Sequence, residues 1–148
     1  MNDHRSIVLF AILSAIAGCG GGSSTAPNAN TNTVTFTNVY SDVLSAICLP
    51  CHAPVGTGYS AGKLDMSVQA LAYSNLQKSA AGASCKASGL KLVVPGDAAM
   101  SLLAEKVESA HPSCGTEMPF GCGGSTPCLS AAQVQEIADW INGGAKNE

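Results

Sequence analysis

The chain has 148 residues, a length that suits one folded domain with short appendages rather than two independent cores. Charged residues make up 11% of it and aromatic residues 5%, and 16 residues are glycine, so the composition is that of a lightly charged chain rich in loops. The net charge of −3 and the lack of any Lys/Arg cluster exclude nucleic acid as a partner. We expect the protein to be a monomer.

The N-terminal residues resemble an export signal. Arg5 precedes an apolar run over residues 7–17, which has the length of a signal peptide rather than of a membrane span. The run ends in Ile-Ala-Gly-Cys, which resembles the lipobox of bacterial lipoproteins, so we expect residues 1–18 to be cleaved and Cys19 to be lipidated. The alternative is an ordinary secretory signal that leaves a spare thiol.

A lipid on Cys19 would hold the protein on the periplasmic side of the cell envelope or at the cell surface. Gly20 after Cys19 resembles lipoproteins that are sorted to the outer membrane, which favours that membrane. The following residues are small or polar and cannot bury enough apolar surface to become ordered, so we expect residues 19–36 to form a flexible tether.

The folded part is predicted to begin with a helix that starts near Thr37 or Asn38 and runs toward Ile47, before Pro50 disturbs it. The next residues, 56–62, are predicted to be a loop. The following elements are predicted, in chain order, as a helix at 68–76 with Ser67 as N-cap, a loop at 79–89, an extended stretch at 90–94, and a helix at 98–107 with Asp97 as N-cap.

The end of the chain carries the clearest helix signal. Residues 109–129 are predicted to be loop. Ser130 and Gln133 form a capping box, and an apolar stripe follows with helical spacing. Gly143 and Gly144 then end the predicted helix.

The pattern C-x-x-C-H at Cys48, Cys51 and His52 is typical of covalent haem attachment. Two thiols at this spacing reach the two vinyl groups of one haem, and the adjacent imidazole lies under the iron as proximal ligand. A redox-active dithiol needs a preceding strand and a zinc site needs a second cysteine pair, and the sequence offers neither. We therefore expect one covalently bound haem c.

The chain has seven cysteines, which favours an oxidising compartment. An even number remains once Cys19, Cys48 and Cys51 are assigned. The remaining cysteines are Cys85, Cys114, Cys122 and Cys128. Spacing alone does not fix their pairing. We favour Cys85 with Cys114 and Cys122 with Cys128, because the second pair closes the compact loop CGGSTPC.

Over most of residues 39–145 the sequence resembles the class I c-type cytochromes. The runs VVPGDAAMSLL, EMPFG and LSAAQVQEIADWINGGA are similar to a branch of small bacterial cytochromes. The resemblance implies a mostly α, single-domain cytochrome c fold over residues 37–148, with about four short helices around one haem and a long disulfide-bearing loop. It also implies His52 as proximal ligand, Met118 as distal ligand, and the helix around Trp140 packing near the haem. The long, cysteine-containing segment before Met118 departs from the family pattern.

Met118 also suits the role of distal ligand by its position. It lies in a Gly-flanked loop rather than on a helical stripe, far enough after His52 for the chain to reach the opposite face of a haem. Met66 and Met100, by contrast, are predicted to be packing residues. His111 is the alternative ligand, and a pair of imidazoles would give a lower potential. A site left open or filled by water is a further alternative.

The sequence therefore predicts a one-electron carrier that meets redox partner proteins, alone or as an accessory subunit of an oxidoreductase, rather than an enzyme. A six-coordinate iron leaves no place for a substrate, and only His52 and His111 remain as histidine bases after the signal. Two alternatives stay open. One is a haem-based sensor or catalytic haem protein with an open distal site. The other is a structural, disulfide-rich surface lipoprotein in which C-x-x-C-H is coincidental.

Overall fold

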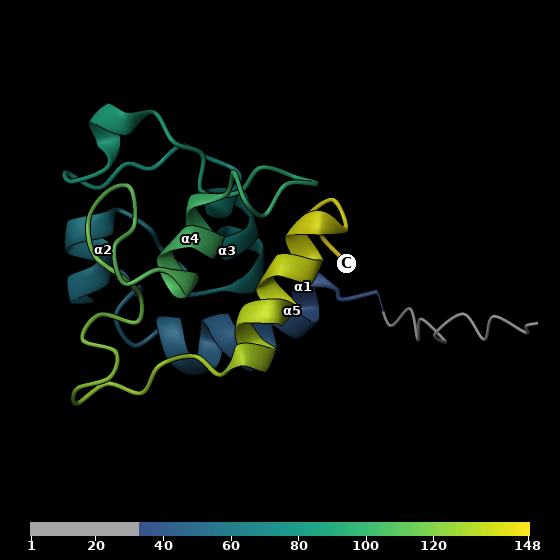
Figure 1. The fold of residues 1–148 in the computed structure, drawn as a ribbon, viewed down its shortest axis with the longest axis horizontal. Coiled ribbons are helices and arrows are strands. Elements are labelled where there is room, and N and C mark those ends of the chain that lie inside the picture. Colours follow the sequence, from purple (N-terminus) through teal and green to yellow (C-terminus); the bar gives the residue numbers. More distant parts are fainter. Residues whose placement is uncertain (1–32) are drawn as a thin grey trace, which may run out of the picture. The chain divides into compact units, whose positions relative to one another are not determined.

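The structure, a computed structural model, describes residues 33–148. The predicted signal peptide, the lipidation site Cys19 and most of the predicted tether lie outside the described residues. This part of the chain is mostly helical, without β-strands, and contains the isolated bridges Ser79 to Lys91 and Cys122 to Thr126. Its helices are α1 (Phe36–Val39), η1 (Tyr40–Cys48), α2 (Thr57–Gly62), α3 (Gln69–Leu76), η2 (Lys86–Ser88), α4 (Leu102–Glu108) and α5 (Ala131–Asn142), drawn in Figure 1.

The first helix starts earlier than predicted. Thr35 is its N-cap, because the Thr35 hydroxyl accepts the backbone N–H of Asn38 and the Asn38 side chain accepts the N–H of Thr35, both at 3.2 Å. Phe36 is fully buried. Phe36, which lies one residue before the predicted start of the domain, therefore belongs to the core.

The winding of this helix changes after Val39. η1 is a π-helix, and Leu49 N–H donates to the carbonyl of Leu44, five residues back, at 2.8 Å. A π-helical turn is rare and is often found beside functional sites. η1 ends at Cys48, the first cysteine of the C-x-x-C-H motif.

Residues 57–62 form the helix α2, where the sequence predicted a loop. α3 lies close to its prediction, but Val68 is its N-cap and makes no side-chain cap bond. The predicted cap Ser67 instead donates its N–H to the Asp65 carboxylate at 2.8 Å. A turn before the helix therefore takes the place of the predicted cap.

α4 begins at Leu102, later than the predicted start at residue 98. Asp97 caps a short turn instead, accepting the Met100 N–H at 3.1 Å, and the Ser101 hydroxyl accepts the Val94 N–H at 2.8 Å. These bonds satisfy the backbone before the helix starts. Met100 is 64% exposed, so the prediction that it packs in the interior is wrong.

α5 forms as predicted. Ser130 and Gln133 make the capping box, and Gly143 ends the helix. In Figure 1 α5 lies across the front of α1, and it packs against both α1 and α4. The first and last helices of the described chain therefore share one core.

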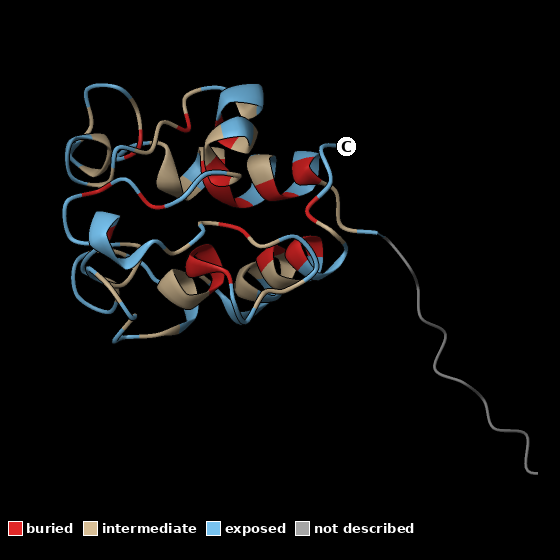
Figure 2. Cartoon of the chain, turned by 90° about the horizontal axis from the view of Figure 1, so that it is seen from above, coloured by how far each residue is buried: buried red, intermediate tan, exposed pale blue. Residues whose placement is uncertain are grey.

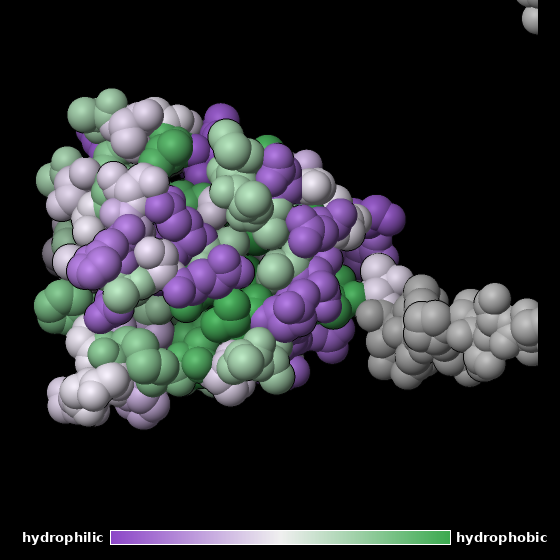
Figure 3. Space-filling view, viewed as in Figure 1, coloured by the Kyte–Doolittle hydropathy of each residue, from purple (hydrophilic) through white to green (hydrophobic). Residues whose placement is uncertain are grey.

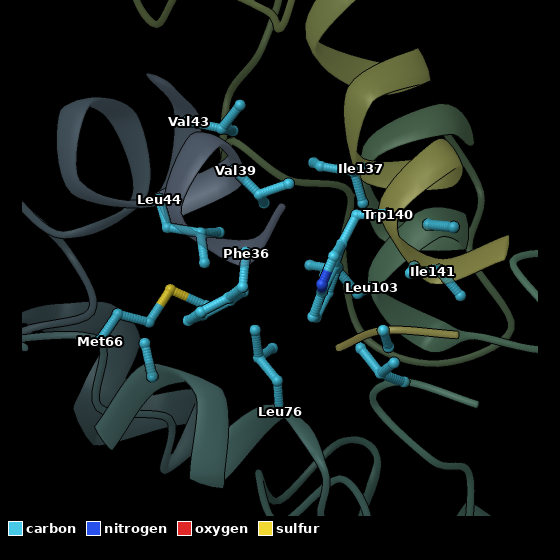
Figure 4. Packing of buried hydrophobic residues seen from close by; sticks show 14 residues of the cluster. Phe36, Val39, Val43, Leu44, Met66, Leu76, Leu103, Ile137, Trp140 and Ile141 are labelled. Carbon is cyan, nitrogen blue, oxygen red and sulfur yellow. The ribbon is translucent and has the colours of Figure 1, made fainter. Parts of the chain in front are cut away.

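An aromatic cluster fills the centre of this core. Phe36 lies between Trp140 and Tyr73, with ring centroids 5.0 and 5.1 Å away, and Figure 4 shows it beside Met66 and Leu76 as well. Buried residues, red in Figure 2, lie on the sides of the helices that face this cluster. Met66 is buried, as predicted for a packing residue.

The C-terminal residues close the core. Trp140 Nε1 donates to the carbonyl of Lys146 at 2.9 Å, and the Tyr73 hydroxyl donates to that of Ala145 at 3.1 Å. The Thr37 N–H donates to the carbonyl of Glu148 at 2.9 Å. The C-terminal segment is thus bonded to α1, α3 and α5.

Residues 109–129 contain no helix, as predicted, and two disulfides hold this loop. Cys85 is joined to Cys114 and Cys122 to Cys128, the pairs favoured from the sequence, with Cα–Cα distances of 5.2 and 4.7 Å. Cys85 also packs with Ala80 and Leu102 in a second, smaller apolar cluster.

Candidate functional site

The C-x-x-C-H motif forms a tight turn at the end of η1. The carbonyl of Cys48 accepts the N–H groups of Cys51, at 3.2 Å, and of His52, at 2.9 Å. Both thiols are free, whereas the other four cysteines of the described chain are in disulfides. The turn therefore brings two free thiols next to one imidazole.

A backbone carbonyl orients the imidazole of His52. The side chain is buried, and its Nδ1 lies 3.1 Å from the carbonyl oxygen of Leu64. A carbonyl can only accept, so Nδ1 carries the proton and Nε2 keeps its lone pair. Burial lowers the pKa of His52, against the smaller opposing effect of the Leu64 bond. A neutral imidazole held in this way could bind a metal ion through Nε2.

α2 lies directly against this imidazole. A Cβ placed on Gly58 would come within 3.0 Å of His52 Nε2 and of the Cys51 carbonyl oxygen, and one on Gly62 would lie 3.5 Å from His52 Cε1. Gly58 therefore keeps the space beside Nε2 free of a side chain. Gly58 and Gly62 were not predicted from the sequence, where their only signal is the repeated occurrence of glycine after the motif.

The two thiols differ in their surroundings. Cys51 is exposed, whereas Cys48 is half-buried. Burial, with a smaller contribution from Cys51, raises the pKa of the Cys48 thiol to about 11. A redox-active dithiol needs a lowered pKa on its attacking cysteine, so the surroundings of Cys48 do not suit that chemistry.

Apolar groups continue from the motif onto the surface. Several half-buried apolar side chains pack against the main core here: Cys48, Leu64, Val107 and Leu129. Figure 3 shows an apolar area, in green, where α4, η1 and the start of α5 lie in Figure 1. An area of this kind suits contact with a flat apolar cofactor.

The two candidate distal ligands lie on the loop after α4, in different surroundings. Met118 is half-buried, and its N–H donates to the Lys106 carbonyl at 2.7 Å. His111 is exposed and lines a surface hollow of about 420 Å³ together with Glu117 and Phe120. The contacts of Met118 tie it to α4, while His111 faces the hollow.

The residues present fit a covalently bound haem. The motif supplies two free thiols and an imidazole whose Nδ1 is held by Leu64, and α2 has a glycine where a side chain would crowd Nε2. In residues 33–148, no group of three or more His, Cys, Asp or Glu side chains converges as a metal site. A haem takes one imidazole from its motif, so it does not need such a group.

Comparison with known proteins returns no match among protein-family models, curated proteins or solved structures. Among the described helices, none is long and apolar enough to cross a membrane.

Proposed function

We propose that this protein is a one-electron carrier that binds one haem c through Cys48 and Cys51, with His52 as proximal ligand. The observation that carries the proposal is the pair of free thiols beside a neutral imidazole whose Nδ1 is held by Leu64. A helix that ends at this motif and is crossed by α5 supports a cytochrome c fold.

A haem bound here would supply a one-electron ferric/ferrous couple. The protein's part is to hold it. Each motif thiol would add across one vinyl group of the haem, with its sulfur on one vinyl carbon and its hydrogen on the other, so the sulfur would no longer ionise and the raised pKa of Cys48 is compatible with the role. The Leu64 carbonyl holds the His52 ring in one orientation, and the apolar groups around Cys48 would exclude water from a bound cofactor.

Met118 is the better distal ligand of the two candidates. Its backbone is hydrogen-bonded to α4 and its side chain is half-buried, whereas the His111 side chain is exposed to water. If Met118 and His52 both bound the iron, no position on it would be left for a substrate. This supports electron transfer over catalysis or gas sensing.

The proposal is tested by expressing the chain together with haem-maturation machinery. We expect a haem-stained band on a denaturing gel and a low-spin, six-coordinate spectrum. Cys51→Ser should reduce the stain, because one of the two thioether bonds is lost, and Cys48→Ser with Cys51→Ser should abolish it. The matched control for the double variant is Cys122→Ser with Cys128→Ser, which also removes two sulfurs and should keep the stain. A haem extracted by acidified organic solvent would contradict covalent attachment, and a high-spin, ligand-binding spectrum would favour the sensor or enzyme.

A further inference from the structure

Lys106 of α4 is hydrogen-bonded to the Met118 loop at every second residue from 114 to 118. Lys106 Nζ donates to the backbone carbonyl of Cys114 and, at 2.7 Å, to that of Thr116. The carbonyl of Lys106 accepts the N–H of Met118 at 2.7 Å. The loop residues 114, 116 and 118 are thus all bonded to a single point of the helix.

The loop is shaped to accept the Lys106 side chain. Gly115 has a φ of +65°, and a Cβ there would come within 2.8 Å of Lys106 Nζ and 3.4 Å of Cys85 Sγ. The positive φ requires glycine here, and a Cβ would displace the Lys106 ammonium from its place against the loop. Two further contacts hold the same stretch. Cys114 is disulfide-bonded to Cys85, and the Glu105 carboxylate accepts the Ser113 hydroxyl at 2.6 Å.

The charge on Lys106 is what makes this attachment strong. Hydrogen bonds from an ammonium to carbonyl oxygens are charge-assisted and about twice as strong as bonds between neutral groups. Lys106 is half-buried, so its ammonium has lost part of its water and the two carbonyls replace it, and the same burial lowers the pKa of Lys106. Releasing the loop would return the ammonium to water but leave the Cys114 and Thr116 carbonyls without this partner.

We propose that Lys106 is a positioning residue for Met118: it fixes the loop so that the thioether stays available as an axial ligand. This inference rests on the proposed function, since the position of Met118 matters only if an iron is bound. Lys106 acts through the backbone of residues 114–118 and does not touch the cofactor itself.

The test compares two variants with the same loss of charge in the ferric holoprotein. Lys106→Met keeps the aliphatic stem and the backbone bond to Met118 but removes both bonds from Nζ. Lys91→Met is the control, since Lys91 is exposed. In a urea titration, the sulfur-to-iron charge-transfer band in the near infrared reports ligation by Met118, and far-ultraviolet circular dichroism reports the helices.

We expect Lys106→Met to lose the near-infrared band at a lower urea concentration than that at which its helices unfold. Before urea is added, the fraction of protein that lacks the sulfur ligand should be roughly tenfold larger than in the unsubstituted protein. Lys91→Met should change neither midpoint. If Lys106→Met fails to fold, Gly115→Ala provides the second test, because its Cβ would crowd Nζ, and it should show the same selective loss.

Three results would overturn the inference, and they separate its failure from that of the proposed function. Equal shifts of band and helix midpoints would make Lys106 a purely structural residue. A wild-type protein with covalent haem but no near-infrared band would exclude Met118 as ligand and leave haem binding standing. A protein without covalent haem would remove both proposals.

Discussion

Gly58 occupies a position where a methyl group would press on the imidazole of His52. We expect Gly58→Ala to lower both the haem content and the melting temperature, because the added Cβ would lie 3.0 Å from Nε2 and from the Cys51 carbonyl oxygen. Gly62→Ala is the matched control in the same helix. Its Cβ would lie at an ordinary 3.5 Å from the ring, so Gly62→Ala should keep the haem and gain at most about 1 kcal/mol of helix propensity, since Gly62 is the last residue of α2. Haem absorbance per protein and thermal unfolding measure both effects, and an equal gain in the two variants would contradict this role of Gly58.

The motif residues could be identified from the sequence, but the residues that support them could not. Cys48, Cys51 and His52 lie within five consecutive residues, at the spacing that covalent haem attachment requires, so the pattern is visible in the chain itself. Leu64 contributes only a backbone carbonyl, which any residue has. Lys106 reaches Cys114 and Thr116 only because the loop folds back over α4, and no local pattern predicts that return.

Each disulfide closes a loop of different length, and this difference leads to a prediction. Cys85 and Cys114 are 29 residues apart, whereas Cys122 and Cys128 are 6 apart. Loop-closure entropy gives a stabilisation of about 3.5 kcal/mol for the first and about 2 kcal/mol for the second. Replacing the first pair by alanines should therefore lower the free energy of unfolding more than replacing the second. Urea denaturation of the two double variants measures the difference, and the reverse order would show that native-state contacts, not chain entropy, dominate.

Local signals decided which helices could be predicted. α5 carries its own capping box and terminal glycine, so its bounds follow from the nearby sequence. α2 could not be predicted because it is rich in glycine, which is a poor helix former. It is nevertheless helical in the structure, where it packs against His52. The start of α4 is set by the Ser101 hydroxyl, which binds Val94 on the preceding stretch. That contact is tertiary, and a cap rule applied to Asp97 cannot detect it.

At the scale of the whole molecule, Phe36 joins the first and last helices into one core. Phe36→Ala should lower the free energy of unfolding by about 3–5 kcal/mol, because a fully buried ring is replaced by a cavity between Trp140 and Tyr73. Phe120→Ala is the matched control, since Phe120 is 69% exposed, and should change it by less than about 0.5 kcal/mol. Chemical denaturation measures the free energy of unfolding of both variants. Similar decreases in the two would show that Phe36 contributes no more to the core than an exposed ring.

The bond from Thr37 N–H to the Glu148 carbonyl places the start of α1 and the end of the chain at the same end of the domain. Cys48 is the last residue of η1 and so lies at the opposite end of the continuous helix formed by α1 and η1. A protein grafted onto an electrode through Glu148 would therefore turn its C-x-x-C-H end toward the solution. A graft on the surface near α2 would reverse that orientation. The attachment point would therefore decide whether the C-x-x-C-H motif faces the electrode or the molecules in solution.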